Sequence, residues 1–305
     1  MEIDFNFRKE RKLGEIVQDF INLIRQIHQH FFGTMLRLSI VPLCMMLLLI
    51  YFGTTKVNLT SQKSLVESMD VILIGIGVLL LMLFIAMLLI GLTIEYFILL
   101  KTNKRLDFDA GMVWLSFRAN FGKYWRFMLM AILALLILAI PVTIVMGIMI
   151  FIPFVGSFAA GIVSAIMGVW FFCAFLFYRE GYARLNNTLT GTFSILKKKL
   201  LDYSIASFLI GMIFQILLFM MTLTPSLILG LIAYNTIGFE ATFFDTFLGR
   251  ILVSIGGTLI GFLYIVYYML SVLVSGIIYE TAKEIAYGED IYERIARLGE
   301  EAHDN

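Results

Sequence analysis

The sequence predicts an all-α integral membrane protein with six transmembrane helices, and two observations support this fold class: its composition and its long uncharged runs. Hydrophobic residues make up 60% of the 305 positions, against roughly 45–50% in soluble globular domains. Charged residues make up 15%, against about 25% in such domains. This composition excludes a soluble enzyme, a disordered chain and a disulfide-rich secreted scaffold. The net charge of +1 gives no general attraction for nucleic acid.

The crossings are predicted from runs without Asp, Glu, Lys, Arg or His, because a charge at mid-bilayer costs at least about 2.5–3.5 kcal/mol. A helix needs about 20 mostly apolar residues to span the hydrocarbon core. Five runs qualify: 38–55, 71–94, 127–178, 203–239 and 251–279. The third run holds 52 residues, so we expect two helices joined by a tight turn at residues 153–156.

The fourth run holds 37 residues and includes Pro225. Proline removes a backbone donor and clashes with the preceding helical turn. We favour one helix that kinks or ends near Pro225. The alternative is a short re-entrant segment, which is tolerated only where protein covers it. One helix here makes six crossings in total.

Lysine and arginine are distributed unevenly between the two sides of this topology. Segments 1–37, 101–126, 179–202 and 280–305 carry twenty of these residues, and the opposite side carries only Lys56, Lys63 and Arg250. By the positive-inside rule, both termini are expected in the cytoplasm, which agrees with an even number of crossings. The first residues show no cleavable signal peptide, so the first crossing is expected to direct insertion.

The chain is expected to form a single polytopic domain over residues 1–305, in which one plan recurs three times. The repeat-like units cover 13–100, 106–178 and 185–279, and a cytoplasmic tail follows over 280–305. Each unit begins with a cytoplasmic segment whose large apolar residues recur at helical steps of three and four. The fold is therefore predicted as three hairpins, each preceded by a cytoplasmic amphipathic helix.

These amphipathic segments supply a candidate rim for binding lipid or a partner protein. In one interpretation their apolar faces lie in the cytoplasmic interface and their basic faces meet anionic headgroups. In the other interpretation, one apolar stripe docks a partner protein. The rim residues are Phe20, Ile24, Trp114, Phe117, Phe121, Trp125, Lys197, Lys198 and Lys199.

Small residues spaced four apart predict close helix packing, because neighbouring membrane helices approach through such positions. The candidates are Gly156, Ala160, Ser164 and Gly168 in the fourth crossing, and Gly257 and Gly261 in the sixth. Packing within this chain is the favoured interpretation, and a homodimer seam is the alternative.

The sequence contains no specific motif for catalysis, phosphate binding or metal binding, so we expect no enzymatic activity, cofactor or metal site. We interpret Glu95, Arg179 and Glu180 as residues at the boundary of the membrane. Polar residues that could line a pocket in the bundle are Gln215, Thr258, Tyr264 and Tyr268. Gln215 is the costliest of them to expose to lipid, so we expect it to face another helix.

The two ends of the chain resemble a known family. The opening over residues 4–16, DFNFRKERKLGEI, is similar to the start of uncharacterised multi-pass inner-membrane proteins of Bacteroidota. The close resembles theirs in Tyr279-Glu280-x-Ala282-Lys283-Glu284 and in Ile291-Tyr292-Glu293-Arg294-Ile295. Those proteins are grouped loosely with the noncatalytic six-helix membrane domain of some glycerophosphodiester phosphodiesterases. The middle of the chain resembles them only in hydropathy.

The resemblance implies a bacterial inner-membrane location and an accessory role beside a MoxR-type ATPase system, and it supplies no catalytic residues. Together with the rim, it predicts a scaffold or accessory subunit without catalytic activity that binds partner protein or lipid. The alternative is a transporter or lipid-handling protein with a cavity in the helix bundle. A homo-oligomer is compatible with either function.

Overall fold

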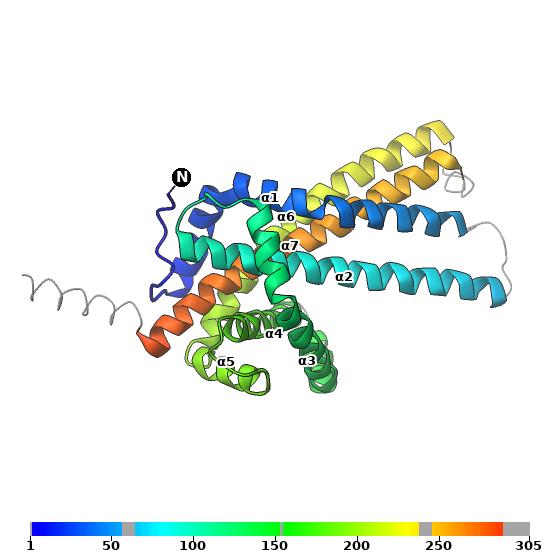
Figure 1. The fold of residues 1–305 in the computed structure, drawn as a ribbon. Helices are drawn as coiled ribbons and strands as arrows, with labels where there is room; N and C mark the ends of the chain where they lie inside the picture. The colour runs from blue at the N-terminus through cyan, green and yellow to red at the C-terminus, as the bar shows by residue number, and fades with distance from the viewer. Residues whose placement is uncertain (1, 57–64, 153–154, 238–245, 289–305) are drawn as a thin grey trace, which may run out of the picture. The chain divides into compact units, whose positions relative to one another are not determined.

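The computed structural model describes residues 2–56, 65–152, 155–237 and 246–288, and within them the regular structure is helical (Figure 1). The helices are α1 (Leu13–Lys56), α2 (Leu65–Asn103), α3 (Ala110–Ile150), α4 (Val155–Arg179), the 3-10 helix η1 (Leu185–Asn187), α5 (Thr188–Leu196), α6 (Leu200–Ile237) and α7 (Phe247–Tyr287). Six of these helices, all except η1 and α5, are long and apolar enough to cross a membrane. The prediction of an all-α, multi-pass membrane protein is therefore confirmed.

The 52-residue uncharged run forms two helices, as its length predicted. α3 ends at Ile150, and the N–H groups of Phe151 and Ile152 donate hydrogen bonds to the carbonyls of Ile148 (3.3 Å) and Met149 (3.0 Å). α4 then begins at Val155. The 37-residue run forms the single helix α6, which continues through position 225 to Ile237.

The expectation of a separate amphipathic helix before each hairpin is wrong for the first two units. α1 continues without interruption from Leu13 to Lys56, and α3 from Ala110 to Ile150, so each contains both the amphipathic segment and the crossing. No proline or turn separates the two parts, and helix propagation is favourable once a helix has nucleated. Only the third unit has a break, where Lys197–Lys199 form a turn between α5 and α6.

The end of the last crossing also differs from the expectation. α7 continues to Tyr287, so the predicted tail begins as helix over residues 280–287. The predicted short helix after Gly288 lies outside the part of the chain that the structure describes.

The chain divides into two compact units, each of which collects pieces that are far apart in the sequence. The first unit comprises residues 1–31, 92–212 and 270–305, and the second comprises residues 32–91 and 213–269. The first unit thus holds the N-terminal segment, the α3–α4 hairpin, α5 and one end of α1, α2, α6 and α7. Its buried residues include the charged side chains of Arg11, Glu95, Glu280 and Lys283.

Close helix packing occurs at some of the predicted small residues and also at glycines that were not predicted. In the second unit, a Cβ at Gly261 would lie 2.9 Å from Met46 Cε, and one at Gly257 would lie 3.6 Å from Ile50 Cδ1. In the first unit, the close approach on α4 is at Gly161, where a Cβ would lie 2.3 Å from Phe208 Cε2.

The predicted α4 stripe does not form one such contact surface. Gly156 is buried, Ala160 is half-buried and Ser164 is exposed. A Cβ at Gly168 would meet open space. The tightly packed side of α4 is therefore rotated by one residue from the stripe that the sequence suggested.

Candidate functional site

The first unit contains a fully buried carboxylate, Glu95 on α2, whose side chain has 0% exposure. Arg179 at the end of α4 donates two hydrogen bonds to it, from Nε to Oε1 (2.7 Å) and from Nη2 to Oε2 (2.9 Å). Two hydroxyl groups of α3 also donate to it, Ser116 Oγ to Oε2 (2.6 Å) and Tyr124 Oη to Oε1 (2.7 Å). Both oxygens of Glu95 are satisfied, so this carboxylate ties α2, α3 and α4 together.

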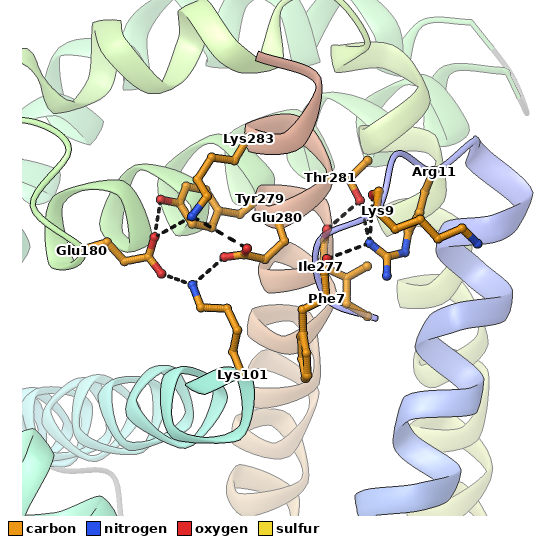
Figure 2. A network of polar contacts seen from close by, with 10 residues as sticks. All are labelled: Phe7, Lys9, Arg11, Lys101, Glu180, Ile277, Tyr279, Glu280, Thr281 and Lys283. Carbon is orange, nitrogen blue, oxygen red and sulfur yellow. Dashed lines mark hydrogen bonds and ion pairs between the residues drawn. The ribbon is translucent and has the colours of Figure 1, made fainter. Parts of the chain in front are cut away.

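A second polar cluster lies where α2, α7 and the residue after α4 meet, and Figure 2 shows its side chains converging. Lys101 of α2 forms ion pairs with Glu180 and with Glu280 of α7, the latter at 2.7 Å. Tyr279 Oη donates a hydrogen bond to Glu180 Oε2 (2.8 Å), and Lys283 Nζ lies 3.3 Å from the same oxygen. The two lysines and the two glutamates of this cluster sum to zero net charge. Such pairing offsets the cost of removing each charged group from water.

Glu180 is the member of this cluster that lies beyond the membrane-spanning part of its helix. Burial acts to raise the pKa of Glu180, but the opposing charges of Lys101 and Lys283 outweigh it. The pKa of this carboxyl therefore lies below its usual value.

The N-terminal strap, residues 2–12, is anchored to the first unit by Arg11, which is 1% exposed. The guanidinium donates through Nε to Asp19 Oδ2 of α1 (2.7 Å) and through Nη1 to Thr281 Oγ1 of α7 (3.2 Å). It also donates to the strap's own carbonyls, those of Phe7 and Lys9 at 3.1 Å each, as Figure 2 shows, and that of Asn6.

The strap has two further anchors. Ile3 N–H donates to the carbonyl of Lys104 (3.1 Å), and the buried ring of Phe7 meets that of Phe97 on α2 at a centroid distance of 5.8 Å. Arg11 also donates to Thr281, so the strap and the C-terminal part of α7 contact one another. They form part of the polar interior of one unit.

These clusters were not predicted, because Glu95, Arg179 and Glu180 were interpreted from the sequence as residues at the boundary of the membrane. A signal was present at Glu95, which directly follows a 24-residue uncharged run and is itself followed by five more apolar residues. A carboxylate placed inside apolar sequence in this way must find a cation. The identity of that cation, 84 residues away, is not a local property of the sequence.

The structure divides the predicted rim into buried and exposed residues. Phe20 and Phe117 are buried at 2% exposure each, so they pack inside the first unit, and Ile24 is half-buried. Trp114, Phe121 and Trp125 remain exposed at 42%, 43% and 46%. Lys197 and Lys198 are exposed, whereas Lys199 forms an ion pair with Glu10 at 2.8 Å.

The exposed aromatic residues of α3 share one side of the helix with Arg118, which is also exposed. The positions 114, 118, 121 and 125 are separated by four, three and four residues, the spacing of one helical face. We call Trp114, Arg118, Phe121 and Trp125 the aromatic face of α3. Val113, Phe117 and Tyr124 lie about a quarter of a turn away around the helix and are buried.

The four predicted pocket residues lie in the second unit, and three of them are exposed. Gln215, Tyr264 and Tyr268 are exposed, so Gln215 does not bury its amide against another helix of the chain. Thr258 is buried, and its hydroxyl donates to the carbonyl of Ser254 one turn earlier in the same helix (2.7 Å).

A surface hollow of about 410 Å³ lies between the strap and α1 and was not predicted. Phe5 and seven polar or charged residues line it: Asp4, Asn6, Lys9, Asp19, Asn22, Arg25 and Gln26. Among the residues described, no group of three or more His, Cys, Asp or Glu side chains is arranged to hold a metal ion.

The chain matches no protein-family model, no curated protein and no solved structure.

Proposed function

We propose that this chain is a scaffold or accessory subunit of the bacterial inner membrane, without catalytic activity of its own, and that it binds a partner protein through the aromatic face of α3. The observation that carries the proposal is the exposure of Trp114, Phe121 and Trp125 around Arg118 on one side of a helix. Tryptophan and arginine dominate the energetic centres of protein interfaces, and aromatic residues are enriched there.

The paired charges of the first unit support a structural role for its ionic groups. Glu95 is saturated by Arg179 and two hydroxyls, and Glu180 by Lys101, Tyr279 and Lys283. Groups held in this way join helices and are not poised to transfer a proton or attack a substrate.

The buried side of α3 supports the proposed interface by fixing the orientation of the exposed side. Tyr124 packs against Phe175 of α4 at a ring-centroid distance of 4.7 Å and against Phe117 at 4.9 Å. A face on a helix that is already ordered loses less conformational entropy when a partner binds. Such preorganisation suits a subunit that presents a docking surface.

The distribution of lysine and arginine places the aromatic face on the cytoplasmic side in this proposal, with both termini on the same side. The resemblance of the chain ends would make the partner a component of a MoxR-type ATPase system. The alternative function, a transporter or lipid-handling protein, would need Gln215, Tyr264 and Tyr268 around one cavity. The side chains of these three residues are exposed, so they do not support the alternative function.

The test is copurification from the native membrane in detergent-free polymer discs, read by native mass spectrometry. We expect a defined heteromeric mass for the unaltered chain and its loss in the triple variant Trp114→Ala, Phe121→Ala, Trp125→Ala. Truncation of an interface hot spot costs about 2 kcal/mol or more, so even one such residue weakens binding roughly thirtyfold.

A matched control removes three exposed apolar side chains from the membrane-spanning part of the same helix: Leu129→Ala, Leu133→Ala, Leu136→Ala. This control variant should keep the partner. Equal loss in both variants, a mass that contains only copies of this chain, or no partner mass after mild extraction would each contradict the proposal.

A further inference from the structure

The strap and the turn between α5 and α6 lie side by side, although they are far apart in the sequence. Lys199 Nζ lies 2.8 Å from Glu10 Oε1, across 189 positions of sequence. The hydrogen bond and charge of Lys199, together with the charge of Lys12, hold the pKa of Glu10 below its usual value. The cations of both segments therefore act on the same small region of surface.

This region carries more positive than negative charge. We call Lys9, Lys12, Lys197, Lys198 and Lys199 the lysine patch. All but Lys199 are exposed, and Lys199 is half-buried beside Glu10. Most of the nearby carboxylates are already engaged: Glu10 binds Lys199, Asp19 binds Arg11 and lies 3.9 Å from Lys9, and Glu15 accepts a hydrogen bond from the backbone N–H of Lys12. Asp202 in the first turn of α6 is exposed, and so is Asp4, which lines the surface hollow with Lys9.

The patch also lies where the chain enters its apolar run. Lys199 directly precedes α6, and the uncharged stretch of that helix begins at Tyr203. Lysines at the end of a spanning helix stand at the depth of lipid phosphates, and clusters of such residues attract anionic headgroups.

We propose that the lysine patch binds the phosphate headgroups of anionic phospholipids, with the strap supplying part of the site. The turn alone would offer three consecutive lysines. The strap adds Lys9 and Lys12, so binding depends on how Arg11 anchors the strap. This inference does not rest on the aromatic face of α3, and it remains testable if no partner protein is found.

The experiment measures lipid binding to the purified full-length chain by native mass spectrometry. The probes are phosphatidylglycerol and phosphatidylcholine with identical acyl chains. We expect preferential retention of phosphatidylglycerol, and a decrease in its association constant of about fivefold for each lysine removed in Lys197→Gln, Lys198→Gln. Lys9→Gln, Lys12→Gln should weaken binding in the same way. Thermal unfolding of each variant checks that it is folded.

The matched control is Arg126→Gln, Arg184→Gln, which removes two exposed cations elsewhere in the same unit. It should bind phosphatidylglycerol as the unaltered chain does. Equal retention of the two lipids, or an equal decrease in the control, would overturn the proposal. Displacement of phosphatidylglycerol by an equal concentration of inorganic phosphate would also overturn it, because the site would then recognise free phosphate. Preferential binding of an acidic partner chain to the same lysines would overturn the proposal as well.

Discussion

The guanidinium of Arg11 joins the strap, α1 and α7, and it does so while almost completely buried. A buried charge is costly unless its hydrogen bonds are satisfied, and here a carboxylate, a hydroxyl and three backbone carbonyls accept from it. The strap has no regular secondary structure beyond an isolated bridge to Arg105. Its order therefore depends on this one side chain more than on its backbone.

We expect Arg11→Ala to release the strap and to lower the free energy of unfolding by about 2–4 kcal/mol, since it removes one partner of a partly buried ion pair and leaves carbonyls unsatisfied. The measurement is thermal unfolding in detergent together with proteolysis of the N-terminus. Arg25→Ala changes an exposed arginine of α1 and should stay within about 0.5 kcal/mol of the unaltered chain. Equal effects in the two variants would show that Arg11 does not anchor the strap.

Glu180 gives a second expectation at this scale, because Lys101 and Lys283 depress its pKa against the effect of burial. A carboxyl whose pKa is lower in the folded state stabilises the fold above its unfolded pKa, about 4.3. That contribution is lost as the pH falls from there through the lower, folded pKa.

The comparison is thermal stability against pH for the unaltered chain and for Glu180→Gln. The difference in stability should be constant from neutral pH down to about 5 and should shrink below about pH 4. A difference that shrinks instead between pH 7 and pH 6 would show that another group is responsible.

At the scale of elements, the end of α4 is held by two adjacent residues of opposite charge. Arg179 binds Glu95 of α2, and Glu180 binds Lys101 of α2 and Tyr279 of α7. The alternation of charge fixes which way the end of α4 is rotated, because exchanging the two side chains would place like charges together. α7 approaches α2 closely at Gly276, where a Cβ would lie 2.6 Å from Phe97 Cζ.

We expect Gly276→Ala to destabilise the protein by about 1–3 kcal/mol, because the ring of Phe97 is buried and packed against Phe7 and cannot move aside. Gly168→Ala is the matched control, since a methyl group there meets open space on α4. Alanine also has the higher helix propensity, so the control should be neutral or stabilised by up to about 1 kcal/mol. Thermal unfolding of both variants tests the packing. A neutral Gly276→Ala would contradict the close approach.

At the scale of the whole molecule, the class, the number of candidate spans and the division of the 52-residue run into two helices could be predicted because each depends on a local run of residues. The length of an uncharged stretch and the presence of charge at its ends are visible in the sequence. The continuity of α1 and α3 was missed because amphipathic periodicity ends at the membrane while the helix does not. Phe117 was grouped with Trp114 on one stripe, and packing against Tyr124 buries it instead.

The polar interior could not be predicted, because its partners are brought together only by the tertiary fold. Arg11 and Thr281 are 270 positions apart, and Lys101 and Glu280 are 179 apart. Neither pair leaves a periodic signal in the chain. The sequence did indicate that charges were scarce, which is the condition under which each of them must be paired.

The contact of Arg11 with Thr281 has a consequence for biogenesis. The strap leaves the ribosome before α7, but one of its hydrogen-bond acceptors is on α7. Glu180 likewise finds Tyr279 and Lys283 only when α7 has been synthesised. Translation proceeds at about 5–20 residues per second, so about 14–54 seconds pass between the synthesis of Arg11 and of Thr281, and about 5–20 seconds between that of Glu180 and of Tyr279. A nascent chain would therefore complete its first unit only after its sixth span has been inserted.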